Sequence, residues 1–463
     1  MDQDPNPERG DVAAIVLAAG KGTRFRSDVA KVLHRTAGRS LVGHVLEALR
    51  PLGLGQVIVV VGHQREDVEA EVAAVGVPGS VTVVQGEQRG TGHAVQVALP
   101  ALREGIDRVV IVPGDTPLLT AATLGSLLDA AEGGVAAMLT AVLDDPTGYG
   151  RVLRDGHGAV DRIVEHRDAT EDERSVGEIN AGMYLVARGP LEDALSRIDD
   201  RNVQGELYVT DVVQILTGDG QRVAAVVADE THVAGVNDRW QLAAAGAVLR
   251  DRHLAHLAAE VGVTIDDPAS THVDVSVRVD RDARLLPGTI LEGSTVVGER
   301  AVVGPNSHLT DTEVGPDATV HSTRADGAAI GRGASVGPFT HLRAGTRLGA
   351  DTKAGAFVET KNADVADGAK VPHLAYVGDA TVGAGANIAC GVITVNYDGR
   401  TKSHTTIGAG AFVGCDVSLI APVTVGADAY VAAGSVVTDD VPDGALAIAR
   451  SRQITKEGWV GER

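Results

Sequence analysis

A glycine-rich segment that carries several cations is the first candidate for chemistry in this chain. The segment LAAGKGTRF covers residues 17–25 and directly follows the apolar run VAAIV at 12–16. Because glycine lacks a Cβ atom, such a turn lets backbone N–H groups come close to a phosphate. Lys21 and Arg24 lie in the segment, and Lys31 follows shortly after it. Three neighbouring cations suit a triphosphate.

Neither familiar phosphate-binding motif is complete in this segment. GKGTRF lacks the GK[ST] ending of the Walker loop and the third glycine of the dinucleotide fingerprint. Taken alone, the segment is therefore also compatible with an ordinary structural turn.

A carboxylate follows a second apolar run. Asp115 comes shortly after RVVIV at 108–112. If that run is a parallel strand, the carboxylate lies at the carboxyl edge of the sheet, where a phosphate-bound Mg²⁺ would be held. An aspartate in a Gly-Asp turn can equally have a structural role.

The first half of the chain has the pattern of an α/β domain that would position these groups. From residue 11 to about 238, short β-branched runs alternate with helical stretches. This alternation predicts βαβ units and a Rossmann-like, mostly parallel sheet. The alanine-rich stretch 237–262 has leucines at 242, 249, 254 and 257 and predicts one long linker helix.

The second half repeats an apolar residue every six positions. Six residues turn an α-helix by about 600°, so no helical face can collect these residues. Small and polar residues fill the intervening positions, and the pattern predicts a parallel β-helix of hexapeptide repeats. We expect loops that leave the coil near 322–329 and 394–406. The repeated positions are Val273, Val279, Leu285, Leu291, Val297, Val303 and Leu309, then Ile330, Val336, Leu342 and Leu348, and finally Ile407, Val413, Leu419, Val425, Val431 and Val437.

Composition narrows the class of protein. The chain has 463 residues, of which 44% are hydrophobic, enough for two or three folded domains. Its net charge of −21 disfavours binding to nucleic acid or anionic lipid. Cys390 and Cys415 have no zinc-site spacing, and the sequence shows neither a secretion signal nor a membrane span. We therefore expect a cytoplasmic protein that binds neither nucleic acid nor membranes.

The motifs together resemble those of a known family. LAAGKGTRF with AKVLH is similar to the signature of sugar-1-phosphate nucleotidyltransferases. With the hexapeptide half, nearly the whole chain resembles the bifunctional N-acetylglucosamine-1-phosphate uridyltransferases/glucosamine-1-phosphate acetyltransferases of bacterial cell-wall precursor synthesis. The other matching segments are VQGEQRGTGHA, PGDTPLL, GYGR, IVEHRDA, EINAGMY, GELYVTD and GVND, in the family's order.

This resemblance implies two reactions. Acetyl-CoA acetylates glucosamine 1-phosphate, and the N-acetylglucosamine 1-phosphate formed then attacks the α-phosphorus of UTP, which gives UDP-N-acetylglucosamine and pyrophosphate. Because uridylyl transfer needs in-line positioning and charge neutralisation, cations and Mg²⁺ should surround the phosphates.

The resemblance assigns a uridyltransferase site to the first half. Arg24 and Lys31 are implied to be catalytic, and Asp115 and Asn237 are implied to hold Mg²⁺. Side-chain amides and backbone between Gln85 and Thr91 would read uracil. The implied nucleotide- and sugar-binding residues are Leu17, Ala18, Ala19, Gly20, Lys21, Arg24, Lys31, Gln85, Gln88, Gly90, Thr91, Pro113, Gly114, Asp115, Gly150, Glu165, Asn180 and Asn237.

The resemblance assigns an acetyltransferase site to the second half. His373 is implied to be the general base that deprotonates the amine. The implied sugar-phosphate ligands are Arg343, Lys361, Tyr376 and Asn387, and the implied acetyl-CoA ligands are Cys390, Asn396, Tyr397, Lys402, Cys415, Ala433 and Arg450. Cys415 stands where the family would have serine, and ACG at 389–391 replaces Gly-Ala-Gly, so binding of coenzyme A could differ here.

The resemblance also implies a left-handed coil that forms a homotrimer. The expected segments are a flexible N-terminus at 1–10, a uridyltransferase domain at 11–238, a linker helix at 239–262, the β-helix at 263–446 and a tail at 447–463. Two alternatives are a monofunctional nucleotidyltransferase whose β-helix serves only for regulation or trimer formation, and a non-catalytic assembly module. His373 and Tyr376 argue against the first alternative, and Lys31 and Asp115 argue against the second.

Overall fold

The computed structural model describes residues 9–130 and 134–460, and the chain divides into two compact units between Leu249 and Arg250. Strand β1 (Arg9–Leu17) begins within the segment predicted as a flexible N-terminus, and residues 1–8 lie outside the described residues. In the part of the chain that is described, no helix is long and apolar enough to cross a membrane.

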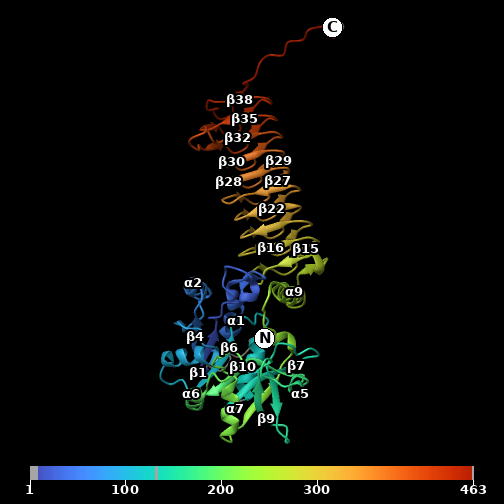
Figure 1. Cartoon of the computed structure of the whole chain (residues 1–463). Coiled ribbons are helices and arrows are strands. Elements are labelled where there is room, and N and C mark those ends of the chain that lie inside the picture. The colour runs from blue at the N-terminus through green and yellow to red at the C-terminus, as the bar shows by residue number, and fades with distance from the viewer. Residues whose placement is uncertain (1–8, 131–133, 461–463) are drawn as a thin grey trace. The chain divides into compact units, whose positions relative to one another are not determined.

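A mostly parallel sheet forms the centre of the N-terminal unit (Figure 1). Its strands lie in the order β11 (Val223–Val227), β7 (Ala136–Val142), β10 (Glu178–Ala187), β6 (Arg108–Pro113), β1, β4 (Leu54–Val61) and β5 (Ser80–Val84). Strand β10 runs antiparallel to β6 and β7, and the hairpin β8 (Arg151–Arg154) and β9 (Val160–Val164) extends from it. The predicted α/β fold is confirmed.

Helices cover both faces of this sheet. Along β1, Ala14 and Val16 belong to one core cluster, and Ala13 and Ile15 belong to the other, as the two-residue period of a strand requires. Burial on both faces explains the continuous apolar run in the sequence. On one face lie α1 (Leu41–Leu49), α2 (Arg65–Val75) and α4 (Ala121–Ala130), and on the other lie α3 (Thr91–Ala98), α6 (Arg188–Arg197) and α7 (Asp211–Gly218); α5 (Glu171–Arg174) and α8 (Glu230–Val233) are short.

A histidine is buried on α1. The imidazole Nε2 of His44 lies 2.9 Å from the carbonyl oxygen of Thr36, so the neutral ring donates this hydrogen bond. Burial, which outweighs the opposing effect of that bond, and the nearby arginines lower the pKa of His44 to about 4. An unfolded chain would have the ordinary value near 6.5, so the unfolded state binds more protons between these two pH values.

Stability should therefore fall as the pH drops from about 6.5 to about 4, by up to about 3 kcal/mol from this group. We expect His44→Gln, whose amide can also donate to Thr36 but does not titrate, to show a shallower fall. Urea unfolding followed by the helical circular dichroism signal measures both proteins at each pH. Equal pH slopes for the two proteins would contradict this role of His44.

The predicted linker helix is present. Helix α9 (Arg239–His256) continues into a π-helical turn, Leu257–Val261, and ends at Gly262, whose φ of 88° is the left-handed conformation common after helix ends. Its leucines divide between two cores: Leu249 packs in a cluster of the N-terminal unit, and Leu254 and Leu257 pack with the C-terminal unit.

The C-terminal unit is a parallel β-helix whose described strands stack in three columns. The first column contains β12 (Thr264–Ile265), β15 (Arg284–Leu285), β18 (Val302–Val303), β21 (Thr319–Val320), β24 (Ser335–Val336), β27 (Lys353–Ala356), β29 (Lys370–His373), β31 (Asn387–Ile388), β34 (Phe412–Val413), β37 (Tyr430–Val431) and β39 (Leu446–Ala447). The second contains β13 (His272–Val273), β16 (Ile290–Glu292), β19 (His308–Thr310), β22 (Thr323–Asp326), β25 (Thr340–Leu342), β28 (Glu359–Val365), β30 (Tyr376–Val382), β32 (Ile393–Val395), β35 (Ser418–Ile420) and β38 (Val436–Val437). The third contains β14 (Arg278–Val279), β17 (Val296–Val297), β20 (Glu313–Val314), β23 (Ala329–Ile330), β26 (Arg347–Leu348), the later halves of β28 and β30, β33 (Thr405–Ile407) and β36 (Val423–Val425).

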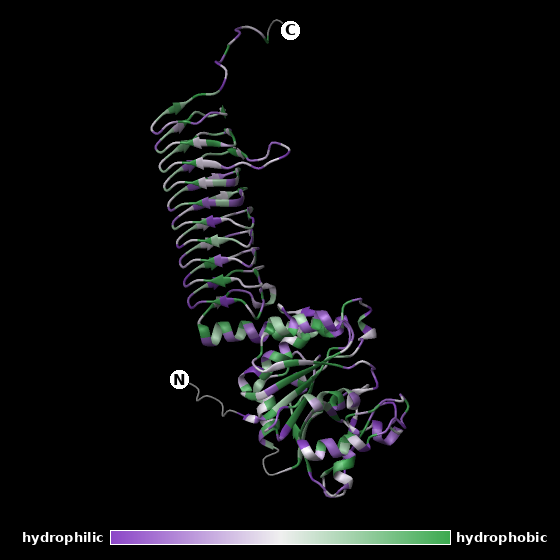
Figure 2. Ribbon diagram, turned by 90° about the vertical axis from the view of Figure 1, so that its left-hand side faces the viewer, coloured by the Kyte–Doolittle hydropathy of each residue, from purple (hydrophilic) through white to green (hydrophobic). Residues whose placement is uncertain are grey.

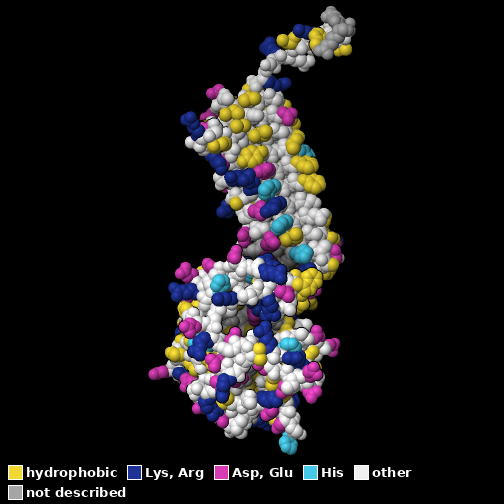
Figure 3. Space-filling model, in the orientation of Figure 1, with side chains coloured by type: hydrophobic (Ala, Val, Ile, Leu, Met, Phe, Trp, Pro, Cys, Tyr) yellow, Lys and Arg dark blue, Asp and Glu magenta, His cyan; other side chains and the backbone are white. Residues whose placement is uncertain are grey.

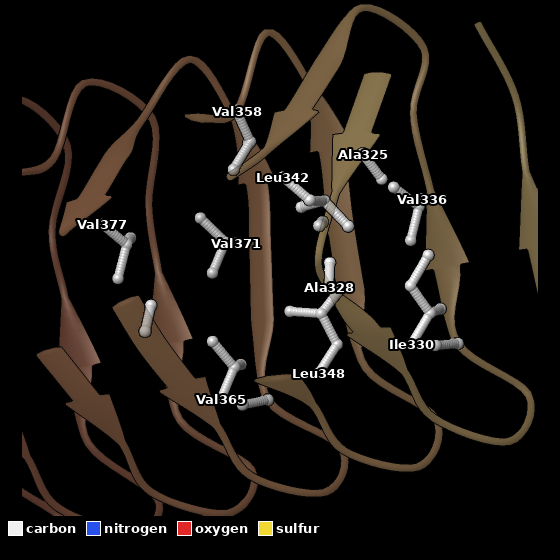
Figure 4. Packing of buried hydrophobic residues seen from close by; sticks show 14 of the residues in the cluster. Ala325, Ala328, Ile330, Val336, Leu342, Leu348, Val358, Val365, Val371 and Val377 are labelled. Carbon is white, nitrogen blue, oxygen red and sulfur yellow. The ribbon is translucent and has the colours of Figure 1, made fainter. Parts of the chain in front are cut away.

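The predicted apolar positions form the core of this coil (Figure 4). Every one of them is at most 4% exposed. One aliphatic side chain per short strand therefore points inward, as the six-residue repeat predicts.

One predicted loop is present and the other is not. The chain leaves the coil between Val395 and Thr405, a protrusion visible in Figure 2. Near 322–329, however, strand β22 pairs with β19 and β25 inside the coil. The repeat there shortens to five-residue steps, with buried Val314 and Ala325 at the inward positions, so the prediction of a loop was wrong.

Candidate functional site

A cleft of about 490 Å³ opens at the carboxyl ends of β1 and β6. It is lined by residues that the sequence singled out, namely Leu17, Ala19, Gly20, Lys21, Gln85, Gln88, Gly90, Thr91, Pro113, Asp115, Glu165 and Asn180. It is also lined by residues that were not predicted, namely Ala94, Gly182, Tyr184, Glu206, Val209 and Thr210. Strand β10 and the chain before α7 supply most of this second group.

The glycine-rich segment is shaped by close packing. Gly22 has a φ of 59°, and a Cβ atom there would lie 2.4 Å from the Cβ of Lys31. A Cβ on Gly20 would instead meet no atom within 4 Å, so the chain is open to the cleft at this glycine. Ala18 is buried, and the N–H of Gly114 donates to the carbonyl of Leu17 at 2.9 Å. Ala18 and Gly114 therefore do not line the cleft themselves but pack behind the residues that do.

Cations and oxygen ligands meet beside this segment. The Nζ of Lys31 forms an ion pair with Asp115 and donates to the amide oxygen of Asn237 at 3.0 Å. The Nη2 of Arg24 donates to the same amide oxygen at 2.8 Å. Asp115 and Asn237 are far apart in sequence, but the N–H of Val236 donates to the carbonyl of Asp115 at 2.9 Å, so the two segments meet here.

The predicted magnesium ligands are one oxygen of Asp115 and one oxygen of Asn237. A carboxylate oxygen of Asp115 and the amide oxygen of Asn237 already share one cation, the ammonium group of Lys31. Among the described residues, no cluster of three or more His, Cys, Asp or Glu side chains could hold a metal. One carboxylate and one amide still fit Mg²⁺, since this ion prefers oxygen and takes further ligands from phosphate and water.

The predicted uracil-reading segment is held against the chain at Leu207. Gly90 has a φ of 107°, and a Cβ atom there would lie 2.5 Å from the carbonyl oxygen of Leu207. The N–H of Gly92 donates to that carbonyl at 2.7 Å. The amide of buried Gln85 donates to the carbonyl of Gly90 at 3.1 Å, and that of Gln88 donates to the carbonyl of Ala19. These contacts hold the segment beside the cleft.

The far end of the cleft is acidic. Glu165 accepts a hydrogen bond of 3.4 Å from the hydroxyl of Thr210. Burial, together with the charges of Asp168 and Asp211, raises the pKa of Glu165 despite that bond. The backbone N–H of Asn180 donates to the carbonyl of Gly150 at 2.9 Å, so Glu165, Asn180 and Gly150 lie together. Carboxylate and amide groups suit the hydroxyls of a sugar.

A second cluster of charge lies on the second strand column of the β-helix, where Figure 3 shows cationic side chains gathered. Lys361 of β28 faces Lys402 from the protruding loop, and this proximity, with the charge of Arg343, lowers the pKa of Lys361. Asp379 accepts hydrogen bonds from the amides of Asn362 at 2.7 Å and Asn396 at 2.5 Å. Although burial opposes them, these bonds and the lysines lower the pKa of Asp379.

Tyr376 lies in the same cluster. Its hydroxyl is 3.5 Å from the amide nitrogen of Asn396. A Cβ atom on Gly378 would lie 2.3 Å from that hydroxyl, so the glycine leaves room for the tyrosine ring. Tyr397, in the protruding loop, pairs with Lys402 through the backbone. The structure therefore brings together Arg343, Lys361, Tyr376, Asn396, Tyr397 and Lys402.

The remaining predicted residues of this half lie elsewhere on the coil. His373 ends β29 and Asn387 is in β31, both in the first strand column. Cys390, Cys415 and Ala433 follow on the corner after that column, and Arg450 lies near Gly434. Among the described residues, no hydrogen bond or ion pair joins this group to the cation cluster.

Comparisons with known proteins agree with both halves. Residues 14–252 match the family model of the MobA-like NTP transferase domain, and residues 404–439 match the bacterial transferase hexapeptide model of six repeats. The chain is 52% identical to "Bifunctional protein GlmU" of Streptomyces avermitilis over 456 residues, which covers 97% of this chain and 94% of that protein.

Other relatives bear the same name. The protein from Mycolicibacterium gilvum is 51% identical, over 98% of this chain and 92% of its own. The protein from Geobacillus sp. is 46% identical, over 96% of this chain and 97% of its own.

Proposed function

This chain belongs to the bifunctional GlmU family and is a uridyltransferase and an acetyltransferase, and from this premise we propose which of its residues carry out each reaction. The N-terminal unit transfers the uridylyl group of UTP to N-acetylglucosamine 1-phosphate and releases pyrophosphate. The C-terminal unit, a left-handed β-helix, transfers the acetyl group of acetyl-CoA to glucosamine 1-phosphate. The observation that carries the proposal is the meeting of Arg24, Lys31, Asp115 and Asn237 beside the cleft.

The uridyltransferase site works by positioning and by neutralising charge. Lys21, Arg24 and Lys31 hold the triphosphate and offset the negative charge that develops on the leaving pyrophosphate. Asp115 and Asn237 hold Mg²⁺, which supplies further positive charge to the phosphates when it is bound. With UTP in the cleft, the phosphates can compete with Asp115 for the ammonium group of Lys31.

The two ends of the cleft then bind the two substrates. At one end, the segment from Gln85 to Thr91 presents amides and backbone groups to uracil, and its fixed position favours one pattern of donors and acceptors. At the other end, Glu165 and Asn180 bind the hydroxyls and the N-acetyl group of the sugar. The phosphate oxygen that attacks UTP is thereby held between them.

In the β-helix, His373 removes a proton from the amine of glucosamine 1-phosphate, which can then attack the thioester carbon of acetyl-CoA. Arg343 and Lys361 bind the sugar phosphate; with Lys402 they form a cation cluster in a strongly acidic protein. Tyr376 and Asn387 also bind the amino sugar. Acetyl-CoA lies along Cys390, Asn396, Tyr397, Lys402, Cys415, Ala433 and Arg450.

We further propose that the chain forms a homotrimer through its β-helix. His373 ends a strand of the first column, and Tyr376, three residues later, begins a strand of the second column, so the acetyltransferase residues flank the corner between these columns. The corner between these columns carries Phe339, Phe357 and Leu374, which are 63%, 59% and 60% exposed. The rings of Phe339 and Phe357 stack with their centroids 5.2 Å apart. An exposed apolar edge of this kind is typical of an interface.

The full-length protein, incubated with acetyl-CoA and glucosamine 1-phosphate, should release free coenzyme A thiol, which a chromogenic disulfide reagent measures. The same protein with UTP, Mg²⁺ and N-acetylglucosamine 1-phosphate should release pyrophosphate. N-acetylglucosamine 1-phosphate in place of glucosamine 1-phosphate is the control for the first assay, because its nitrogen is already acetylated. Absence of thiol release would exclude the acetyltransferase activity.

A further inference from the structure

Two cysteines stand directly above one another in the β-helix. Ile388 of β31 pairs with Val413 of β34, and Cys390 and Cys415 each follow two residues later. The register continues through both cysteines, since the N–H of Asp416 donates to the carbonyl of Cys390 at 2.8 Å. Cys390 and Cys415 therefore occupy the same corner position on consecutive turns of the coil.

This stacking brings the two thiols within reach of one another. Neighbouring parallel strands lie about 4.8 Å apart, and disulfides join residues whose Cα atoms are about 4.4–6.8 Å apart. Residues at one position of successive turns also point in the same direction. Both cysteines are free, and in the single coil Cys415 is exposed and Cys390 is partly exposed. In the proposed trimer, an oxidant reaches them through the acetyl-CoA site that they line.

We propose that Cys390 and Cys415 form a reversible disulfide across two turns of the coil, a site of thiol modification. Exposed Cys415 is the entry point. Its thiolate attacks one sulfur of a low-molecular-weight disulfide, forms a mixed disulfide and releases one small thiolate. The thiolate of Cys390 then attacks the sulfur of Cys415 and releases the second small thiolate. The two protons and two electrons that the cysteines lose are carried away by two small-molecule thiols.

The bond should be easy to reduce. The Cβ atoms of residues stacked at strand spacing are about 4.8 Å apart, whereas a relaxed disulfide prefers about 3.8 Å. Closing this gap draws two turns of the coil together at their corner. Because a strained and exposed disulfide has a more oxidising potential, it suits a reversible switch rather than a structural bridge.

The effect on activity rests on the proposed function, in which this corner lies along acetyl-CoA. Movement of the corner misplaces the acetyl donor, and displacement by about 1 Å can cost about 100-fold in rate. Oxidation should therefore slow acetyl transfer on the order of 10- to 100-fold and leave uridylyl transfer unchanged. Reduction with dithiothreitol should restore acetyl transfer.

The experiment uses full-length protein treated with oxidised glutathione. Intact-mass measurement should show the loss of two hydrogens, and non-reducing peptide mapping should find the peptides of Cys390 and Cys415 linked. Protein that carries only glutathione adducts, or covalent dimers joined through these cysteines, would overturn the proposal. If the reduced protein transfers no acetyl group, the proposed function fails, whereas the mass result still decides the disulfide.

Ala433 offers a matched test of register, because it occupies the same corner position on the turn after Cys415. The double variant Cys390→Ser with Ala433→Cys keeps two thiols on consecutive turns and should form the disulfide. The double variant Cys415→Ser with Ala433→Cys places the thiols two turns apart, about 9.6 Å at strand spacing, and should gain glutathione instead. A disulfide in the second variant would contradict the assigned register.

Discussion

The Asp115→Ala variant should lose uridylyl transfer by about 10²–10³-fold, the scale of removing one preorganised group that stabilises charge in a transition state. Asp115 is the carboxylate of the proposed Mg²⁺ site and the ion-pair partner of Lys31. Its removal therefore weakens metal binding and also frees a catalytic lysine. The measurement is pyrophosphate release at saturating UTP. Chelation of divalent ions should reduce this release in the same selective way.

Acetyl transfer by Asp115→Ala should stay at the level of the unaltered protein, because the acetyltransferase residues lie in the other unit. Asp129→Ala is the matched control: Asp129 is exposed, pairs with Arg9 and does not line the cleft. It should keep both activities, since exposed ion pairs contribute little. Equal loss of both activities in Asp115→Ala would contradict two separate sites.

The His373→Ala variant should show the converse pattern. Loss of a general base costs about 10²–10⁴-fold, so release of coenzyme A thiol should fall by that factor while pyrophosphate release is unchanged.

His308→Ala is the matched control for this test. His308 is a histidine on the same coil, but its Nε2 lies 2.8 Å from the carboxylate of Glu292 on the preceding turn of its column. Its loss should change neither activity. Acetylation that persists in His373→Ala would exclude this residue as the base, and the cation cluster would then need another proton acceptor beside it.

The sequence predicts the β-helix well because the six-residue repeat is a local pattern. One aliphatic residue in six must point inward, and the residues from Val273 to Leu309 follow this rule without interruption. The rule fails where the step shortens. Ala325 is fully buried at an inward position, but its small side chain gives no apolar signal, so the segment looks like an interruption. The five-residue spacing from Val320 to Ala325 and from Ala325 to Ile330 was the available clue.

The candidate sites are harder to predict because they depend on contacts between distant segments. The cleft residue Tyr184 comes from β10, which runs antiparallel to β6, and Thr210 comes from the chain before α7, which is hydrogen-bonded to the segment at Arg89 to Gly92. No local pattern reports that placement. Likewise, the separation of His373 from Lys361 follows from the columns on which they lie, which depend on the count of residues in every preceding turn.

Helix α9 limits how the two activities can be divided into separate proteins. Its first turns belong to the uridyltransferase unit: Leu249 packs in the same cluster as Phe25 and Val236, and the side chain of Arg239 donates to the carbonyl of Phe25 at 3.1 Å. A fragment that ends at residue 238 would lose this support beside the glycine-rich segment and Asn237. Gene fission or recombination between relatives would therefore preserve nucleotide binding only if the junction falls after Leu249.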